Sequence, residues 1–138
     1  MKSPNAALIA ALIAAQALIR RMPVGESVVN AILSLVRGAR PETAASDAVR
    51  QHVAWGPGPR AAQALMLATR VRALMQGRLS PSQDDVAALA LPVLRHRIVT
   101  NFNAEADGVT SESVVQRLLE ATPIDAAADA RPLDRLIS

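Results

Sequence analysis

The chain has 138 residues, with no cysteine, no tyrosine and a single lysine, Lys2. Because that lysine stands next to the first methionine, the chain contains no G-x-x-x-x-G-K-[ST] phosphate-binding loop. The absence of cysteine excludes disulfides, thiolate nucleophiles and cysteine-ligated zinc. Few catalytic chemistries remain open to these residues.

The charge balance argues against a nucleic-acid partner. The net charge is +3 although the pI is near 10.9, because almost nothing in the chain titrates between neutrality and the arginine range. Only Trp55 and Phe102 could stack on bases. Since 51% of the residues are apolar, we expect one folded domain without nucleic-acid binding.

The N-terminal apolar run, residues 6–15, allows two interpretations. Ala15-Gln16-Ala17 after it resembles a signal-peptidase site. However, the helical spacing of apolar residues continues through that point to Ile19, the preceding charged region is only Lys2, and the run is too short to span a bilayer. We therefore expect a buried, alanine-rich helix in a cytoplasmic protein with no membrane span.

Helical patterns dominate the remaining chain. The apolar spacing and the Gly, Pro, Ser and Thr boundaries predict helices over about residues 26–37, 59–76, 81–91 and 110–122. Gly38 is expected as a left-handed C-cap, and residues 39–48 as a surface loop. Residues 49–55 fit either a short helix or a short extended piece. The sequence predicts an all-α, four- to five-helix bundle over residues 1–122, followed by a loosely held tail, 123–138.

Two helices carry more specific expectations. For the helix from residue 59, the spacing predicts a buried face made of Ala64, Leu67, Ala68, Val71, Leu74 and Met75. For the helix that follows, Ser80-Pro81-Ser82-Gln83 predicts a capping box with Ser80 as the N-cap. Asp84 and Asp85 then suit the positive end of that helix, which should end at Leu91-Pro92.

The sharpest local feature is Gly56-Pro57-Gly58-Pro59-Arg60. Pro59 suits the first helical position and Gly58 the N-cap, so Arg60 lies at the positive end of the helix dipole, where a cation is unfavourable unless an anion is near. Because the prolines lack amide donors, only the guanidinium group is suited to bind phosphate. The anion is either a ligand or a carboxylate of another helix, and the residues leave both open.

The histidines and paired acids have structural explanations. His52 and His96 are far apart, and the sequence contains neither H-E-x-x-H nor G-x-S-x-G. Asp84 and Asp85 follow no strand, so a magnesium-binding role is not indicated. We expect no catalytic residue and no metal ligand in this chain.

Arg95, His96 and Arg97 form a second polar cluster. We expect it to cap carbonyls at a helix end and to pair with carboxylates such as Glu105 and Asp107. Contact with a ligand is the alternative role.

Several motifs together resemble the C-terminal region of MoxR-type AAA+ ATPases, which are similar to magnesium chelatase ATPase subunits. Residues 55–61 (WGPGPRA) resemble the family's W/Y-G-x-x-P-R-[AG] motif, and residues 92–98 (PVLRHRI) resemble its P-x-L-R-H-R stretch. Residues 101–109 (NFNAEADGV), 20–24 and 35–41 match further motifs in the same order. The likeness covers roughly residues 16–120, whereas the first fifteen residues and the tail match poorly.

The resemblance implies a helical lid that follows an α/β core, with the P-loop and magnesium-binding acids in that core. Arg60 then matches the sensor 2 arginine, which reaches toward the γ-phosphate of ATP in cis or in trans. ATP and Mg²⁺ would be bound mainly by the core, and this chain alone should be inactive as an ATPase. Implied partners are the core, neighbouring subunits of a ring and von Willebrand factor A domain proteins, in chaperone-like remodelling or metalloenzyme maturation. The alternative function is a stand-alone helical adaptor that binds an acidic partner.

Overall fold

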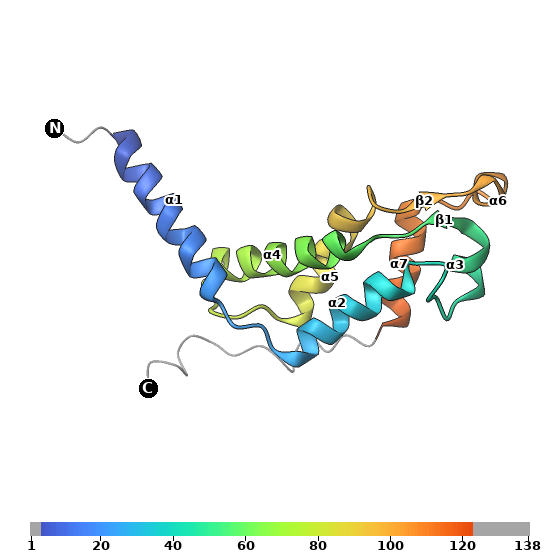
Figure 1. Ribbon diagram of the computed structural model, residues 1–138, viewed down its shortest axis with the longest axis horizontal. Helices are drawn as coiled ribbons and strands as arrows, with labels where there is room; N and C mark the ends of the chain where they lie inside the picture. Colours follow the sequence, from blue (N-terminus) through green and yellow to red (C-terminus); the bar gives the residue numbers. More distant parts are fainter. Residues whose placement is uncertain (1–3, 123–138) are drawn as a thin grey trace.

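The computed structural model describes residues 4–122, so the predicted tail, 123–138, lies outside the described residues. The described part contains seven helices and a two-stranded ribbon (Figure 1). In chain order they are α1 (Pro4–Arg21), α2 (Glu26–Gly38), α3 (Asp47–His52), β1 (Val53–Trp55), α4 (Pro59–Met75), α5 (Gln83–Leu94), β2 (Val99–Thr100), α6 (Phe102–Ala106) and α7 (Ser111–Ala121). The all-α class is confirmed, with two short helices, α3 and α6, added to the expected bundle.

The core lies among α2, α4, α5 and α7. Helix α5 packs against α4, α2 and α7, and α2 also contacts α4 and α7. Each helix contributes aliphatic side chains that are almost completely buried, which favours this packing through removal of apolar surface from water. The largest of them are Val28, Ile32, Leu35, Leu65, Val86, Leu94 and Val115.

The ambiguous segment, residues 49–55, forms both of the predicted alternatives in succession. Helix α3 ends at His52, and β1 follows it directly. β1 pairs antiparallel with β2, with Val53 opposite Thr100 and Trp55 opposite Val99. Figure 1 shows this ribbon, with α3 and α6, at the end of the molecule opposite α1.

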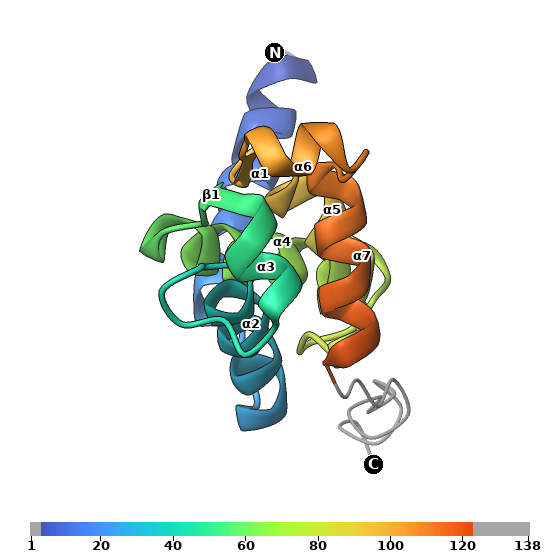
Figure 2. The same cartoon turned by 90° about the vertical axis from the view of Figure 1, so that its right-hand side faces the viewer.

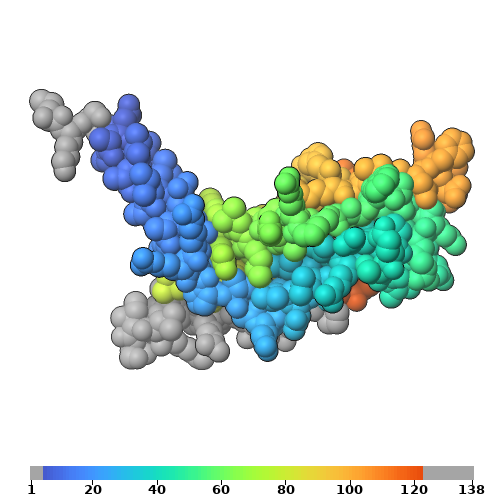
Figure 3. Space-filling view, in the orientation of Figure 1, coloured from blue at the N-terminus to red at the C-terminus, as the bar shows by residue number. Residues whose placement is uncertain are grey.

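Helix α1 exists as predicted, but the prediction that it is buried is wrong. It projects away from the bundle, as Figures 1 and 3 show, and its main packing partner within the described part of the chain is α4. Leu8, Ile9, Leu12 and Ile13 are each more than half exposed. An apolar pattern predicts a helix, but burial also requires a neighbouring element, and the described residues supply one only near its C-terminal end.

A helix that crosses a membrane needs about 20 consecutive, mostly apolar residues. Among residues 4–122, no single helix is long and apolar enough. Residues 5–21 and 26–38 reach the required length and composition only as a pair, which is bent by 90°.

The end of α2 differs from the expectation for Gly38. This glycine lies inside α2, and the C-cap is Ala39 in a right-handed conformation. A Cβ atom at Gly38 would lie 3.1 Å from Cδ2 of Leu118. Gly38 therefore permits close packing of α7 on α2 instead of a left-handed turn.

Helix α4 has the predicted boundaries and the opposite buried face. The side chains that it buries are Ala61, Leu65, Thr69 and Ala73. Leu67 and Met75, which were expected to be buried, are 54% and 82% exposed. Because α4 carries apolar residues on both sides, its sequence alone does not decide which side meets α2 and α5. Gly77 closes the helix with a φ of 74°, as expected.

Helix α5 begins two residues later than expected and continues further. Its N-cap is Ser82, not Ser80, and Asp85 occupies the third position of the capping box. The helix also continues through Pro92 to Leu94 instead of ending at Leu91-Pro92. Leu94 is completely buried, so core packing of the last turn offsets the hydrogen bond that proline cannot make. In α7, the predicted Thr110 cap is confirmed, because its side chain accepts from the Ser113 amide.

Candidate functional site at the start of α4

The loop before α4 is held tightly against the end of α2. A Cβ atom at Gly56 would lie 2.6 Å from Cα of Arg40 and 2.8 Å from the carbonyl oxygen of Ala39. Only glycine allows this approach without a shift of the backbone. The next residue, Pro57, is completely buried. The loop is therefore anchored immediately before the residues that begin the helix.

The first turn of α4 presents Arg60 to solvent. Gly58 is the N-cap in an extended conformation and Pro59 is the first helical residue, as predicted. Ala61 is 1% exposed and packs into the core, whereas Arg60 is exposed. The first turn contains no acidic residue. The fold thus fixes the backbone of Arg60 and places its positive charge at the positive end of the helix dipole.

No carboxylate neutralises Arg60 within residues 4–122. The arginines that form ion pairs in this part of the chain are Arg40, Arg50, Arg72 and Arg78, and Arg60 is not among them. A salt bridge to another helix, one of the two possibilities left open by the sequence, is therefore not found among these residues. The unfavourable placement of Arg60 is still without a compensating anion.

Arg60 lines a surface cavity of about 540 Å³. The lining residues are Pro57, Gly58, Pro59, Arg60, Ala61 and Arg97. Two of them are arginines from different elements and none is acidic. The cavity is therefore suited to an anionic group by its charge.

Arg97 reaches this cavity from the turn after α5. Its Nη1 donates a hydrogen bond of 2.7 Å to the carbonyl oxygen of Val93, so the expected capping of carbonyls by this cluster is confirmed. The expected pairing with Glu105 or Asp107 is wrong for the described chain, because Asp107 instead lies 2.9 Å from Nε2 of His52. The sequence motif singled out Arg97 but not its position beside Arg60.

The paired acids belong to a structural network. Asp85 is completely buried and accepts from the Ser82 amide at 2.7 Å, from Arg72 at 2.5 Å and from both terminal nitrogens of Arg78. Burial raises the pKa of Asp85, but the hydrogen bonds from Arg78, Ser82 and Arg72 outweigh burial and lower it below its usual value. The pKa of Arg78 is raised by the same hydrogen bond and only partly reduced by burial. This network joins the end of α4 to the start of α5.

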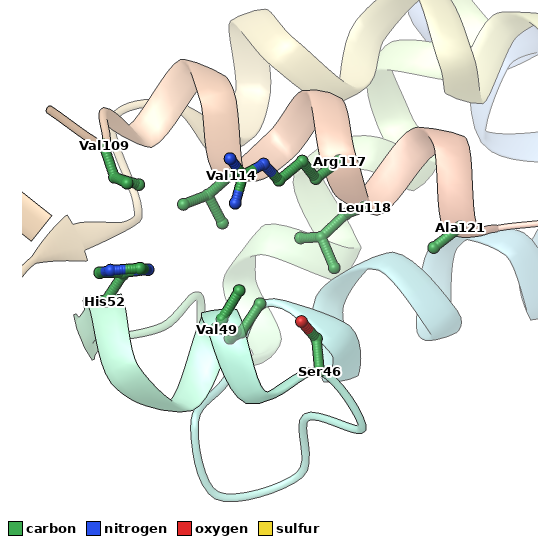
Figure 4. Close-up of a pocket in the computed structure, with 9 residues that line it drawn as sticks. Ser46, Val49, His52, Val109, Val114, Arg117, Leu118 and Ala121 are labelled. Atoms are coloured by element: carbon green, nitrogen blue, oxygen red, sulfur yellow. The ribbon is translucent and has the colours of Figure 1, made fainter. Parts of the chain in front are cut away.

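A second cavity, between α3 and α7, is too small and apolar to be a nucleotide site. In Figure 2, α3 and α7 lie next to each other, and Figure 4 shows Val49 facing Val114 and Leu118. The cavity measures about 60 Å³, room for no more than a few water molecules. His52 and Arg117 also line it, but most of its lining is aliphatic.

The described residues fit a phosphate group but not a magnesium ion. Guanidinium forks match the oxygens of phosphate, and Arg60 and Arg97 supply two of them at one cavity. Magnesium prefers carboxylate oxygens, and residues 4–122 contain no group of three or more potential metal ligands. A bound nucleotide would therefore depend on other residues for its metal.

Comparison with known proteins shows the family of this chain. Residues 45–118 match the family model for the AAA lid domain. The chain is 33% identical over 102 residues to Chaperone MoxR1 of Mycobacterium tuberculosis. The aligned region covers 73% of this chain and 27% of that protein. It is also 34% identical over 77 residues to an uncharacterised protein, YeaC, of Bacillus subtilis. That aligned region covers 54% of this chain and 24% of YeaC.

A solved structure shows the same fold. The crystal structure of a candidate ATPase from Cytophaga hutchinsonii superposes with a TM-score of 0.72 and 27% identity, covering 78% of this chain and 33% of that one. The chain therefore spans about a quarter of the curated relatives and a third of this structure. Since the family model covers more than half of the chain, the chain belongs to the AAA lid domain family, in the form found in MoxR-type AAA+ ATPases.

Proposed function

We propose that this chain is the lid of a MoxR-type AAA+ ATPase and that Arg60 serves as its sensor 2 arginine. In this proposal Arg60 contacts the terminal phosphate of ATP held by an α/β core, whose P-loop and acids also hold Mg²⁺. The observation that carries the proposal is an exposed arginine in the first turn of α4, with no carboxylate partner within residues 4–122 and a cavity in front of it. A terminal phosphate supplies the negative charge that this position lacks.

The packing of α4 explains how such a contact reaches the rest of the lid. One side of α4 packs against the bundle through Ala61, Leu65, Thr69 and Ala73. A displacement of Arg60 toward a bound phosphate therefore moves α4 and its neighbouring helices together. Loss of the terminal phosphate removes the charge-assisted contact and releases the lid from the core. Rigid-body rotation of this kind is a common form of nucleotide-dependent switching.

The wider setting follows from the family and is part of the same proposal. The lid works in a cytoplasmic ring, beside its own core and a neighbouring subunit, and Arg60 acts in cis or in trans. The ring serves chaperone-like remodelling or metalloenzyme maturation, with partners that include von Willebrand factor A domain proteins. The name Chaperone MoxR1, carried by one relative, supports this setting.

The test restores a core domain and replaces Arg60 with alanine. We expect ATP turnover and nucleotide-dependent assembly to fall by at least about tenfold, because a charge-assisted contact to the reacting phosphate is lost. Arg117→Ala on α7 removes the same charge from an exposed residue that does not line the cavity beside Arg60. This variant should leave turnover and assembly unchanged. Unchanged turnover and assembly in Arg60→Ala would exclude the sensor 2 role.

A second candidate function, an adaptor that binds an acidic partner, is favoured by a groove between α4 and α5. The groove measures about 760 Å³, and its lining includes the apolar residues Leu67, Val71 and Met75 together with Arg72 and Arg97. An apolar surface that also carries arginines suits a helix with acidic flanks. The coding sequence upstream separates the two functions, because an in-frame phosphate-binding loop supports the lid and its absence supports the adaptor.

A further inference from the structure

We propose that Arg97 acts with Arg60 as a two-arginine clamp for a polyphosphate. This inference rests on the proposed function, since it adds a second phosphate ligand to the same site. Arg60 is the second residue of α4 and Arg97 lies in the turn between α5 and β2, so the two come from separate parts of the sequence. Both line the one cavity in front of the Gly-Pro-Gly-Pro loop.

The charges around the cavity favour an anion. Two arginines line it, its lining contains no carboxylate, and neither arginine has an ion-pair partner in residues 4–122. Arg72 and Arg78, on the same pair of helices, both reach Asp85. Like charges at one cavity repel each other, and an anion between them offsets that repulsion. The two unpaired arginines are therefore concentrated where a ligand would neutralise both.

Arg97 is positioned while most of its donors stay available. One terminal nitrogen is held by the Val93 carbonyl at 2.7 Å, and its backbone amide donates to Leu94 at 2.9 Å. The turn is fixed on both sides, since Leu94 is 0% and Ile98 5% exposed. The remaining guanidinium donors, which have no partner among the described residues, are free to bind a ligand.

The loop explains why a second guanidinium group is needed. Phosphate-binding loops usually supply several backbone amides, but Pro57 and Pro59 have none to offer. A di- or triphosphate carries more negative charge and more acceptor oxygens than a single carboxylate, so it can neutralise two arginines at once. Arg97 supplies the donors that the proline-containing loop lacks, so the site fits a di- or triphosphate better than a single carboxylate.

The experiment titrates the full chain with inorganic triphosphate at low salt, by calorimetry and by NMR of the arginine side-chain Nε resonances. We expect Arg97→Ala and Arg60→Ala each to weaken the association by roughly fivefold or more. Arg97→Lys, which keeps the charge but not the fork, should give an intermediate loss. Arg95→Ala is the matched control, because it removes one charge from the same turn outside the cavity, and should change the association by less than about twofold.

The outcomes separate this inference from the proposed function. If Arg60→Ala weakens binding while Arg97→Ala and Arg97→Lys behave like Arg95→Ala, the clamp is overturned and the role of Arg60 stands. If the wild-type chain does not bind triphosphate, or if Arg60→Ala alone has no effect, the clamp is also overturned, and the restored-core assay decides the role of Arg60 by itself. Circular dichroism of each variant shows whether a loss of binding reflects a loss of fold.

Discussion

Arg78 and the buried carboxylate of Asp85 form a bidentate ion pair, with Nη1 2.7 Å from Oδ2 and Nη2 2.6 Å from Oδ1. Asp85 also closes the capping box of α5, so a single carboxylate holds the start of α5 and the turn after α4 together. The two helices it joins are those whose other ends carry Arg60 and Arg97. The ion pair therefore joins the two helices next to the candidate site, in addition to their packing against each other.

Replacement of Asp85 by asparagine should destabilise the lid. The change leaves Arg72 and Arg78 without their carboxylate partner and weakens the cap, and we expect a loss of about 2–3 kcal/mol in the free energy of unfolding. Urea unfolding of the two proteins at neutral pH measures the difference. Asp84→Asn is the control, because Asp84 is exposed and its contact with Arg72 is long, at 3.5 Å. This change should cost less than about 0.5 kcal/mol. Equal losses in the two variants would contradict this assignment.

The same carboxylate predicts a pH dependence. The pKa of Asp85 in the folded protein lies below its ordinary value of 3.8, so its contribution to stability is complete above that value and is lost as the pH falls through the lowered pKa. The difference in unfolding free energy between wild type and Asp85→Asn should therefore be largest near neutrality and shrink in acid. Melting temperatures from neutral pH down to about pH 3 provide the measurement. A difference that stays constant over this range would show that the charge of Asp85 contributes nothing.

Gly56 should tolerate no side chain. A methyl group there would overlap the backbone of Ala39 and Arg40, and we expect Gly56→Ala to cost about 1–3 kcal/mol and to displace the loop that carries Arg60. Gly58→Ala offers a matched comparison two residues away, because nothing lies within 4 Å of a Cβ atom there. Thermal unfolding of both variants tests the contrast, and similar melting temperatures would argue against the tight packing of this loop.

Local signals in the sequence predicted both ends of α4 and the start of α7, but neither end of α5. Gly58-Pro59 and Gly77 bound α4 as expected, because capping depends on residues that are neighbours in the chain. Burial was predicted less well. Leu65 and Leu67 are the same residue type on two sides of one helix, and only the packing of α2 and α5 decides that Leu65 is inside. The exposure of α1 has the same cause, since few described residues cover it.

Of the two arginines at the candidate site, the sequence predicted a role for Arg60 but not the position of Arg97 beside it. Arg60 stands out locally, because a glycine and proline loop followed by an arginine is unusual at a helix start. Arg97 gives no such signal. It is far from Arg60 in the sequence, so the sequence does not show that both residues line one cavity. Residues that meet only through tertiary packing could not be joined by spacing alone.

The corrected orientation of α4 predicts a large loss of stability on truncation of Leu65 and almost none on truncation of Leu67. Leu65 is 0% exposed, so Leu65→Ala should leave a cavity and cost about 3 kcal/mol. Leu67 is 54% exposed, so Leu67→Ala should change the free energy of unfolding by less than about 0.5 kcal/mol. Urea unfolding of the two variants gives both values. A larger loss for Leu67→Ala would show that the face first expected from the sequence is the buried one.

Arg60 should lower the stability of the chain that carries it. A cation in the first turn opposes the helix dipole by about 0.3–1 kcal/mol, and no carboxylate within residues 4–122 offsets this cost. Arg60→Ala should therefore leave the free energy of unfolding unchanged or raise it by a similar amount, with the gain shrinking as salt is added. Arg60→Lys, which retains the charge, should match the wild type. Urea unfolding at low and high salt distinguishes these outcomes. A loss of stability in Arg60→Ala would mean that the arginine has a structural partner after all, and would remove the main argument for a phosphate at this position.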